Sequence, residues 1–227
     1  MHLISPAIHM PTILLINPNT SARSLAVMME IAAGHLPSGI DLRGVSSARG
    51  VPMIVNEDDL RASAAEVVRL GEAGASGVSA VIVAAFGDPG VGTLRRAIGI
   101  PVVGIGEASI FEAAADGRRF GIATTTPRLV RSIEAMVNKL SLGHWFSGVR
   151  VPEGDPIRLA ADVSLQEEAL AQAVRDCFAV DGAEAVVIGG GPLSAAARAL
   201  RDRFGTAIIE PVPASVRRAL RLMAAEI

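Results

Sequence analysis

The sequence predicts an α/β fold in which two pseudo-symmetric lobes, each built on a parallel sheet, enclose a ligand cleft. Short runs rich in Val and Ile alternate with longer helical patterns, which is typical of repeated strand–helix units. Half of the 227 residues are apolar, but the chain has only six Phe, one Trp and no Tyr. We therefore expect a core of aliphatic strands covered by helices. Turns of similar composition recur in the two halves, which indicates two equivalent lobes.

The first half of the chain is expected to hold four strands, over Thr12–Ile16, Asp41–Ser46, Val78–Ala85 and Pro101–Ile105. Its helices are expected after the first strand as far as Leu36, over Asp58–Gly71 and from Glu107. The spacing of apolar residues at three and four positions predicts these helices.

The second half is expected to repeat this order, with strands over Phe120–Ala123, Phe146–Val151, Ala185–Ile188 and Ala207–Ile209. A helix is expected to open at Pro127, since Thr124–Thr126 can cap it and proline suits a first turn. Further helices are expected over Leu165–Val180 and from Ala214. We expect residues 11–112 and 207–227 to form the first lobe, residues 113–206 to form the second, and residues 1–10 to be a flexible N-terminal extension.

Composition excludes several classes of partner. The net charge of −2 gives no reason to expect a nucleic acid. No apolar run approaches the ~20 residues of a membrane span. The single cysteine, Cys177, excludes an intramolecular disulfide, so we expect a cytoplasmic protein. The apolar segment 142–146 favours a homo-oligomer.

Four turns follow predicted strands and should converge at the carboxyl ends of the sheets, where ligands bind in open parallel folds. They are Asn17–Ser21, Phe86–Gly90, Thr124–Thr126 and Gly189–Gly191. Their hydroxyls, amides and consecutive backbone N–H groups suit a carboxylate or carbonyl oxygen. The expected substrate-binding residues are Asn17, Thr20, Phe86, Gly87, Thr124, Thr125, Gly190 and Gly191.

Simpler interpretations of the same residues stay open. Thr20 and Ser21 can equally be helix caps, whereas Asn17 favours ligand contact. Asp88 can be a base, but an aspartate before proline at a helix start is more often a cap. Glu210 ends the last strand and is as readily a carboxylate at a helix start. No metal-ligand cluster, phosphate loop or nucleophile elbow is present in the sequence, and we expect no metal.

Three motifs, Ile16–Ser21 (INPNTS), Phe86–Gly90 (FGDPG) and Gly104–Ala108 (GIGEA), carry a family resemblance. In this order and spacing the chain, from about Pro11 onward, resembles the Asp/Glu/hydantoin racemase superfamily, most of all its hydantoin and allantoin racemase branch. The resemblance implies two pseudo-symmetric lobes with the substrate between them. It also implies racemisation without a cofactor, by two cysteines that act as acid and base on opposite faces of the stereocentre.

The chain departs from this family at both implied cysteine positions, which hold Ala85 and Gly190. Neither side chain can carry a proton, and loss of a positioned acid or base typically costs ~10²–10⁴-fold in rate. Cys177 is expected within the helix Leu165–Val180, away from the cleft, as a small packing residue. A two-thiol racemase mechanism is therefore not expected.

Three functions remain open at this stage. The first is an isomerase-family enzyme, free of cofactors, that acts on a small amino-acid derivative, hydantoin or ureide with a thiol-free site. Its weak candidates for proton transfer are Asp88 and Glu210, and Glu107 is a further candidate. The second is a non-catalytic binder of a small molecule. The third is a decarboxylase that uses the same anion-stabilising cleft.

Overall fold

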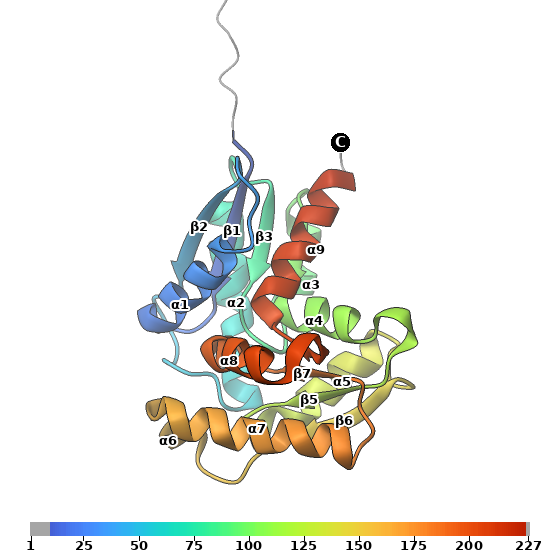
Figure 1. The fold of residues 1–227 in the computed structure, drawn as a ribbon. Coiled ribbons are helices and arrows are strands. Elements are labelled where there is room, and N and C mark those ends of the chain that lie inside the picture. Colours follow the sequence, from blue (N-terminus) through green and yellow to red (C-terminus); the bar gives the residue numbers. More distant parts are fainter. Residues whose placement is uncertain (1–9, 226–227) are drawn as a thin grey trace, which may run out of the picture.

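The computed structural model describes residues 10–225, which fold into two four-stranded parallel sheets covered by helices (Figure 1). The strand order is β2-β1-β3-β4 in the first sheet and β6-β5-β7-β8 in the second. When the strands of each sheet are counted from the first in sequence, both sheets have the order 2-1-3-4. The two lobes are therefore equivalent in topology, as predicted. The extension expected over residues 1–10 lies outside the described residues except for Met10.

The strands are β1 (Thr12–Asn17), β2 (Asp41–Ser46), β3 (Ala80–Val83), β4 (Val102–Gly104), β5 (Phe120–Ala123), β6 (Phe146–Arg150), β7 (Ala185–Ile188) and β8 (Ile208–Ile209). The helices are α1 (Ala22–Ala33), α2 (Glu57–Gly74), α3 (Val91–Ala97), α4 (Ile105–Ala113), α5 (Val130–Lys139), α6 (Pro156–Ala161), α7 (Val163–Ala179), α8 (Ser194–Phe204) and α9 (Pro211–Ala225). A single 3₁₀ turn, Pro127–Leu129, precedes α5, and α9 begins at Pro211 rather than at the expected Ala214.

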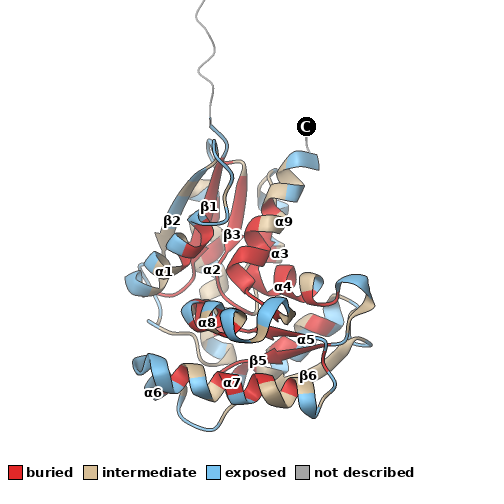
Figure 2. Ribbon diagram, viewed as in Figure 1, coloured by how far each residue is buried: buried red, intermediate tan, exposed pale blue. Residues whose placement is uncertain are grey.

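Side chains that point alternately to the two faces of each sheet divide the core into layers. In β1, Ile13 and Leu15 face α1 and α9, whereas Leu14 and Ile16 face α2 and α3. Successive strand residues point to opposite faces of a sheet, so a strand that is buried on both faces must be apolar throughout. Figure 2 shows this burial along β1 and β3, whereas the edge strand β2 is exposed or intermediate.

One hydrophobic cluster joins the two lobes. It contains Ile13 and Ile82 of the first sheet together with Phe120, Val187 and Ile209 of the second, and all five are at most 2% exposed. Helices α4, α5 and α9 contribute to the same cluster. The lobes are therefore packed as one body around a common core.

The pairing of β8 corrects one part of the expected lobe assignment. Residues 207–227 were expected to belong wholly to the first lobe, but Ile208 and Ile209 pair with Val186 and Val187 of β7 in the second sheet. The chain then returns, and α9 packs on β3, β4 and α4. Residues 207–227 are divided between the lobes because the two-residue strand β8 completes the second sheet before the chain crosses back to the first lobe.

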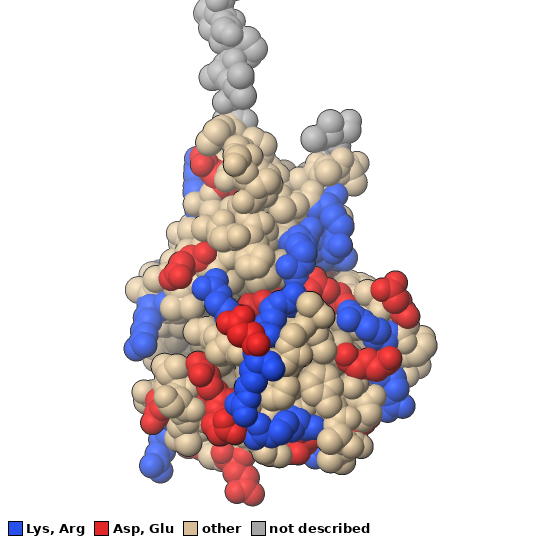
Figure 3. All heavy atoms as spheres, in the orientation of Figure 1, with Lys and Arg blue, Asp and Glu red and all other residues tan. Residues whose placement is uncertain are grey.

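Charged residues lie mainly on the outer helix surfaces, and a basic stripe runs over α9 and α8 (Figure 3). Part of this stripe is paired: Arg217 of α9 contacts Glu112 of α4, with N–O distances of 2.6 and 2.9 Å. Within residues 10–225, no helix combines the length and apolar character needed to cross a membrane.

The carboxyl group of Asp88 holds the start of α4. Its two oxygens accept hydrogen bonds from the backbone N–H groups of Gly106 (2.8 Å) and Glu107 (2.6 Å). The side chain of Glu107 in turn contacts Arg95 of α3, which also donates to the carbonyl of Val102 in β4. Asp88 is thus a helix cap, but for α4 rather than for the helix that directly follows it.

Two glycines leave the space for this carboxyl group. A Cβ atom on Gly104 would overlap the Asp88 carboxyl group, and one on Gly106 would lie 3.0 Å from its Oδ1. Asp88 itself has a left-handed φ of 51°, which aspartate tolerates better than most residues. The FGDPG and GIGEA motifs are therefore two halves of one structural contact.

Burial sets the protonation of Asp88. The residue is half-buried as a whole, but its carboxyl group is enclosed, and desolvation raises its pKa to about 7. The nearby charge of Glu107 acts in the same direction, and the two backbone N–H groups act against it. Because the folded pKa exceeds the unfolded value, stability from this group is full below the unfolded pKa and is lost as the pH rises through about 7.

We predict that Asp88→Asn lowers the free energy of unfolding by about 1–3 kcal/mol, because an amide cannot accept both backbone N–H groups. The advantage of aspartate over asparagine should be smaller at about pH 8 than at about pH 5, given the raised pKa. Urea unfolding of both proteins at each pH measures this difference. If the difference in unfolding free energy between the wild type and Asp88→Asn grew with pH, the ionised carboxylate of Asp88 would be the favoured form.

We predict that Gly104→Ala destabilises the protein by about 2 kcal/mol or more, because the new methyl group takes the place of the Asp88 carboxyl group. Gly99→Ala is the matched control, since its Cβ would meet no atom within 4 Å, and we expect a change within about 0.5 kcal/mol. Thermal unfolding compares the two variants. In an Asp88→Gly background the cost of Gly104→Ala should shrink, and an unchanged cost would contradict the proposed overlap.

Candidate functional site

A narrow pocket of about 40 Å³ lies where the carboxyl ends of strands from both sheets meet. The segment after β3 contributes Ala84, Ala85 and Phe86, and those after β5 and β7 contribute Thr124–Thr126 and Gly189–Leu193. Parallel α/β sheets place ligand sites at this edge because the connections there are free to vary. Three of the four turns that the sequence singled out therefore converge as predicted, and the fourth is represented by Asn19.

The Thr125 hydroxyl is the clearest sign of a ligand. This side chain is 1% exposed and lines the pocket, yet its Oγ1 has no hydrogen-bond partner among the described residues. A buried hydroxyl without a partner is costly, and native structures rarely leave one unexplained. The neighbouring Thr124 differs, because its hydroxyl lies 2.7 Å from the carbonyl of Gly189 and 3.0 Å from the Thr126 hydroxyl.

Asn19 supplies a second free donor to the pocket. Its Oδ1 accepts from the backbone N–H of Ser21 (2.9 Å) and from Nδ2 of Asn17 (2.8 Å). The Ser21 N–H can only donate, so this contact fixes the orientation of the Asn19 amide. Its NH₂ group, with no acceptor in the described part of the chain, remains available to a ligand oxygen.

The positions that the family resemblance assigns to cysteines both line the pocket. Ala85 lies after β3 and Gly190 lies after β7, so they come from different lobes. None of the described lining residues has an acidic, basic, imidazole or thiol side chain. The pocket can therefore donate hydrogen bonds, but its side chains cannot take up a proton near neutral pH.

The backbone explains why residue 190 is a glycine here. Gly190 has a φ of 156°, which L side chains rarely adopt, and a Cβ atom there would lie 3.1 Å from Leu193. The Gly190 N–H, like that of Thr125, has no acceptor among the described residues. This turn thus offers a backbone donor where the resemblance implies a thiol.

Three residues expected to contact a substrate, Asn17, Thr20 and Gly87, do not line the pocket, and their contact with a substrate stays a prediction. Asn17 is fully buried and uses its amide to hold its own turn, since Nδ2 donates to Asn19, Ser21 and Ser46. Thr20 only closes the turn, through its N–H to Val51. Gly87, with a φ of 109°, packs against Leu60.

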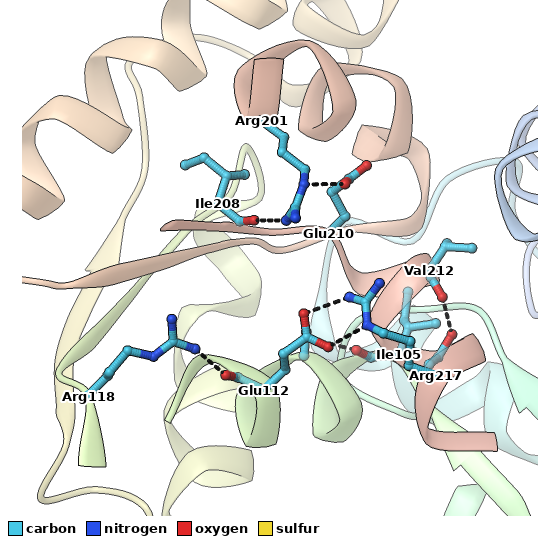
Figure 4. Close-up of polar contacts among 10 residues, drawn as sticks. Ile105, Glu112, Arg118, Arg201, Ile208, Glu210, Val212 and Arg217 are labelled. Carbon is cyan, nitrogen blue, oxygen red and sulfur yellow. Dashed lines mark hydrogen bonds and ion pairs between the residues drawn. The ribbon is translucent and has the colours of Figure 1, made fainter. Parts of the chain in front are cut away.

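The three carboxylates considered for proton transfer also lie outside the lining residues. Asp88 caps α4, and Glu107 contacts Arg95. Glu210 is 6% exposed and its Oε1 lies 3.4 Å from Nε of Arg201, which also donates to the carbonyl of Ile208 (Figure 4). Each carboxylate is thus occupied in joining elements of the fold.

Cys177 lies on α7 and is fully buried between that helix and the second sheet, next to Gly121. Burial raises the pKa of its thiol to about 12, and the charge of Asp181 acts in the same direction. It does not line the pocket, as the sequence predicted.

The predicted turns include Asn19 and Thr126 without singling them out, and the lining residues that the sequence did not indicate are Met53, Ile54, Ala84, Leu129, Ile133, Pro192 and Leu193. Asn19 could have been found, because it shares the INPNTS turn with Asn17. Met53 and Ile54 come from the segment between β2 and α2, which carries no distinctive motif.

Comparisons with known proteins agree with this geometry. The sequence model of the family described as Asp/Glu/Hydantoin racemase matches residues 13–219. A hydantoin racemase from Rhizobium meliloti is 32% identical over 93% of this chain and 88% of that protein. An allantoin racemase from Klebsiella pneumoniae has a TM-score of 0.90 at 27% identity, covering 96% of this chain and 89% of the other.

A more distant structure shares the fold alone. Arylmalonate decarboxylase has a TM-score of 0.63 at 20% identity, covering 96% of this chain and 94% of the other. The match of the family model over most of the chain, with the two-lobed fold and the pocket at the strand ends, leads to one conclusion. This chain belongs to the Asp/Glu/hydantoin racemase family.

Proposed function

We propose that this protein binds a hydantoin or ureide in the pocket between its lobes and promotes proton exchange at the stereocentre by stabilising the enolate. The unpartnered, buried hydroxyl of Thr125 carries this proposal. The hydantoin and allantoin racemases among its relatives support the class of compound. The sequence-based expectations of a cytoplasmic location and of a homo-oligomer stay predictions.

Hydrogen-bond donors suit the charge that develops in this reaction. When the proton leaves the stereocentre, its electron pair moves toward the adjacent carbonyl oxygen, which becomes negative. The Thr125 hydroxyl, the Asn19 NH₂ group and the Gly190 N–H are available to hold that oxygen. One such preorganised donor typically contributes on the order of 10²–10³-fold in rate.

Water supplies the proton transfers in this proposal, because no lining side chain can do so. Water or hydroxide takes the proton from the stereocentre, and water returns one to either face of the planar enolate. The reaction is then slower than with a positioned acid and base by ~10²–10⁴-fold for each missing group. We expect its rate to rise with hydroxide concentration.

A non-catalytic binder is the second candidate, and the absence of an acid or base among the lining residues favours it. A decarboxylase is the third, since an enolate formed by loss of CO₂ needs only one proton. Hydantoin and ureide incubated in D₂O distinguish these functions. Deuterium at the stereocentre supports the proposed exchange, thermal stabilisation without deuterium supports the binder, and CO₂ release from a malonate supports the decarboxylase.

We predict that Thr125→Val slows deuterium incorporation on the order of 10²-fold, because it removes an oxyanion donor without changing the shape of the side chain. The ligand-free variant should be as stable as the wild type or more so, since it loses a buried hydroxyl without a partner. Mass spectrometry and thermal unfolding measure the two effects.

The neighbouring substitution Thr124→Val is the matched control. It removes a hydroxyl that has two partners, so the free protein should lose about 1–2 kcal/mol of stability. Equal loss of stability in both variants would contradict a free hydroxyl on Thr125.

We predict that Ala85→Cys accelerates deuterium exchange by ~10²-fold or more, because it places a thiol at the pocket without backbone strain. Gly190→Cys should instead lower stability by about 1–3 kcal/mol, given its φ of 156°. Exchange rates and thermal unfolding of the two single variants test this contrast. A folded Ala85→Cys variant with an unchanged rate would argue against a reacting centre beside residue 85.

A further inference from the structure

A second, larger cavity adjoins the pocket. It has a volume of about 260 Å³ and shares Met53, Gly191 and Pro192 with the first. Its opposite walls come from the N-terminal turn of α1 in the first lobe and from α6 and α7 in the second. The two spaces therefore adjoin at these three residues, and the flexible methionine is the most adaptable of them.

Gln166 is a buried polar side chain in the wall of this cavity. The residue is 7% exposed, and its side-chain amide makes no hydrogen bond within the described residues. Neither amide atom is among the buried atoms that lack a partner, so the exposed part of the side chain is its polar end. A ligand that displaces water from this amide must replace the hydrogen bonds that the water makes. The cavity is where such a ligand can reach it.

The charge in the cavity wall points to an anion. Arg23 is an exposed residue in the first turn of α1 that lines the cavity, and it has no acidic partner among the described residues. That turn contains no acidic residue, and none of the described residues that line the cavity is an aspartate or glutamate. The positive end of α1 lies in the same wall, where the Ser21 hydroxyl accepts from the Ser24 N–H at 3.1 Å.

We propose that this cavity is a subsite for a carboxylate-bearing substituent on the ring carbon of the substrate. The ring occupies the pocket beside Thr125, the substituent passes Met53, and its carboxylate meets Arg23 and Gln166. This inference rests on the proposed function, because it needs the ring to bind in the first pocket. It extends that function by naming which hydantoins the protein selects.

The test uses three probes with the full chain: methylhydantoin, a hydantoin with a propionate group on its ring carbon, and the corresponding propionamide. We expect the propionate to bind about tenfold more tightly than the propionamide in calorimetry, as a charge-assisted contact at an exposed arginine allows. Arg23→Met should remove this preference without changing the affinity for methylhydantoin. Gln166→Leu should weaken the binding of the propionate and leave the affinity for methylhydantoin unchanged.

Arg43→Met is the matched control, since Arg43 is an exposed arginine of β2 that lines neither cavity. It removes the same charge and should leave the preference for the propionate intact. If the Arg43 and Arg23 variants lost the preference for the propionate equally, the preference would depend only on net charge, and the proposed subsite would be wrong.

The remaining outcomes separate the subsite from the function on which it rests. If methylhydantoin binds but the propionate has no advantage over the propionamide, the subsite is wrong and the proposed function stands. If none of the three probes binds or stabilises the protein, the proposed function fails as well.

Discussion

The contact between the Asp88 carboxyl group and the first N–H groups of α4 is the constraint on which the site depends. It joins the turn after β3, which carries Ala85 and Phe86 into the pocket, to a helix that packs against both lobes. A helix start is a natural partner for a carboxyl group, since its N–H groups lack acceptors within the helix. Burial nevertheless raises the pKa of Asp88, so the contact combines favourable geometry with an unfavourable environment for charge.

The fold was largely predictable because strands buried on both faces leave continuous apolar runs. β5 and β7, which are buried throughout, occur at the predicted residues, and so does β2, although no residue of this edge strand is buried. The helices α3 and α6, of seven and six residues, were not predicted, since a helix of about two turns gives a weak periodic signal. The helix α8, of 11 residues, was not predicted either. β8 was found as a strand but assigned to the wrong sheet, because a segment of two residues carries no information about its partner.

The site was predictable only as far as strand ends can be located. The lining residues that were predicted all lie within three residues of the end of a buried strand, namely Phe86, Thr124, Thr125, Gly190 and Gly191. Within the first turn, however, the sequence cannot tell which asparagine faces inward, and Asn19 does so while Asn17 holds the turn. The role of Asp88 was assigned to the nearer helix, since a partner 18 residues away is determined by tertiary packing rather than by local pattern.

The hydrophobic cluster shared by the two lobes has a consequence for how quickly ligands come and go. Opening the lobes like a hinge would separate aliphatic side chains of both sheets and expose them to water, at a cost that grows with the area exposed. The segment 47–56, which contributes Met53 and Ile54 to the pocket, is only partly buried and packs on the shared cluster through Ile54 alone. Displacing this short connection exposes less apolar surface than opening the lobes does, so we expect changes in its length to alter the residence time of a ligand.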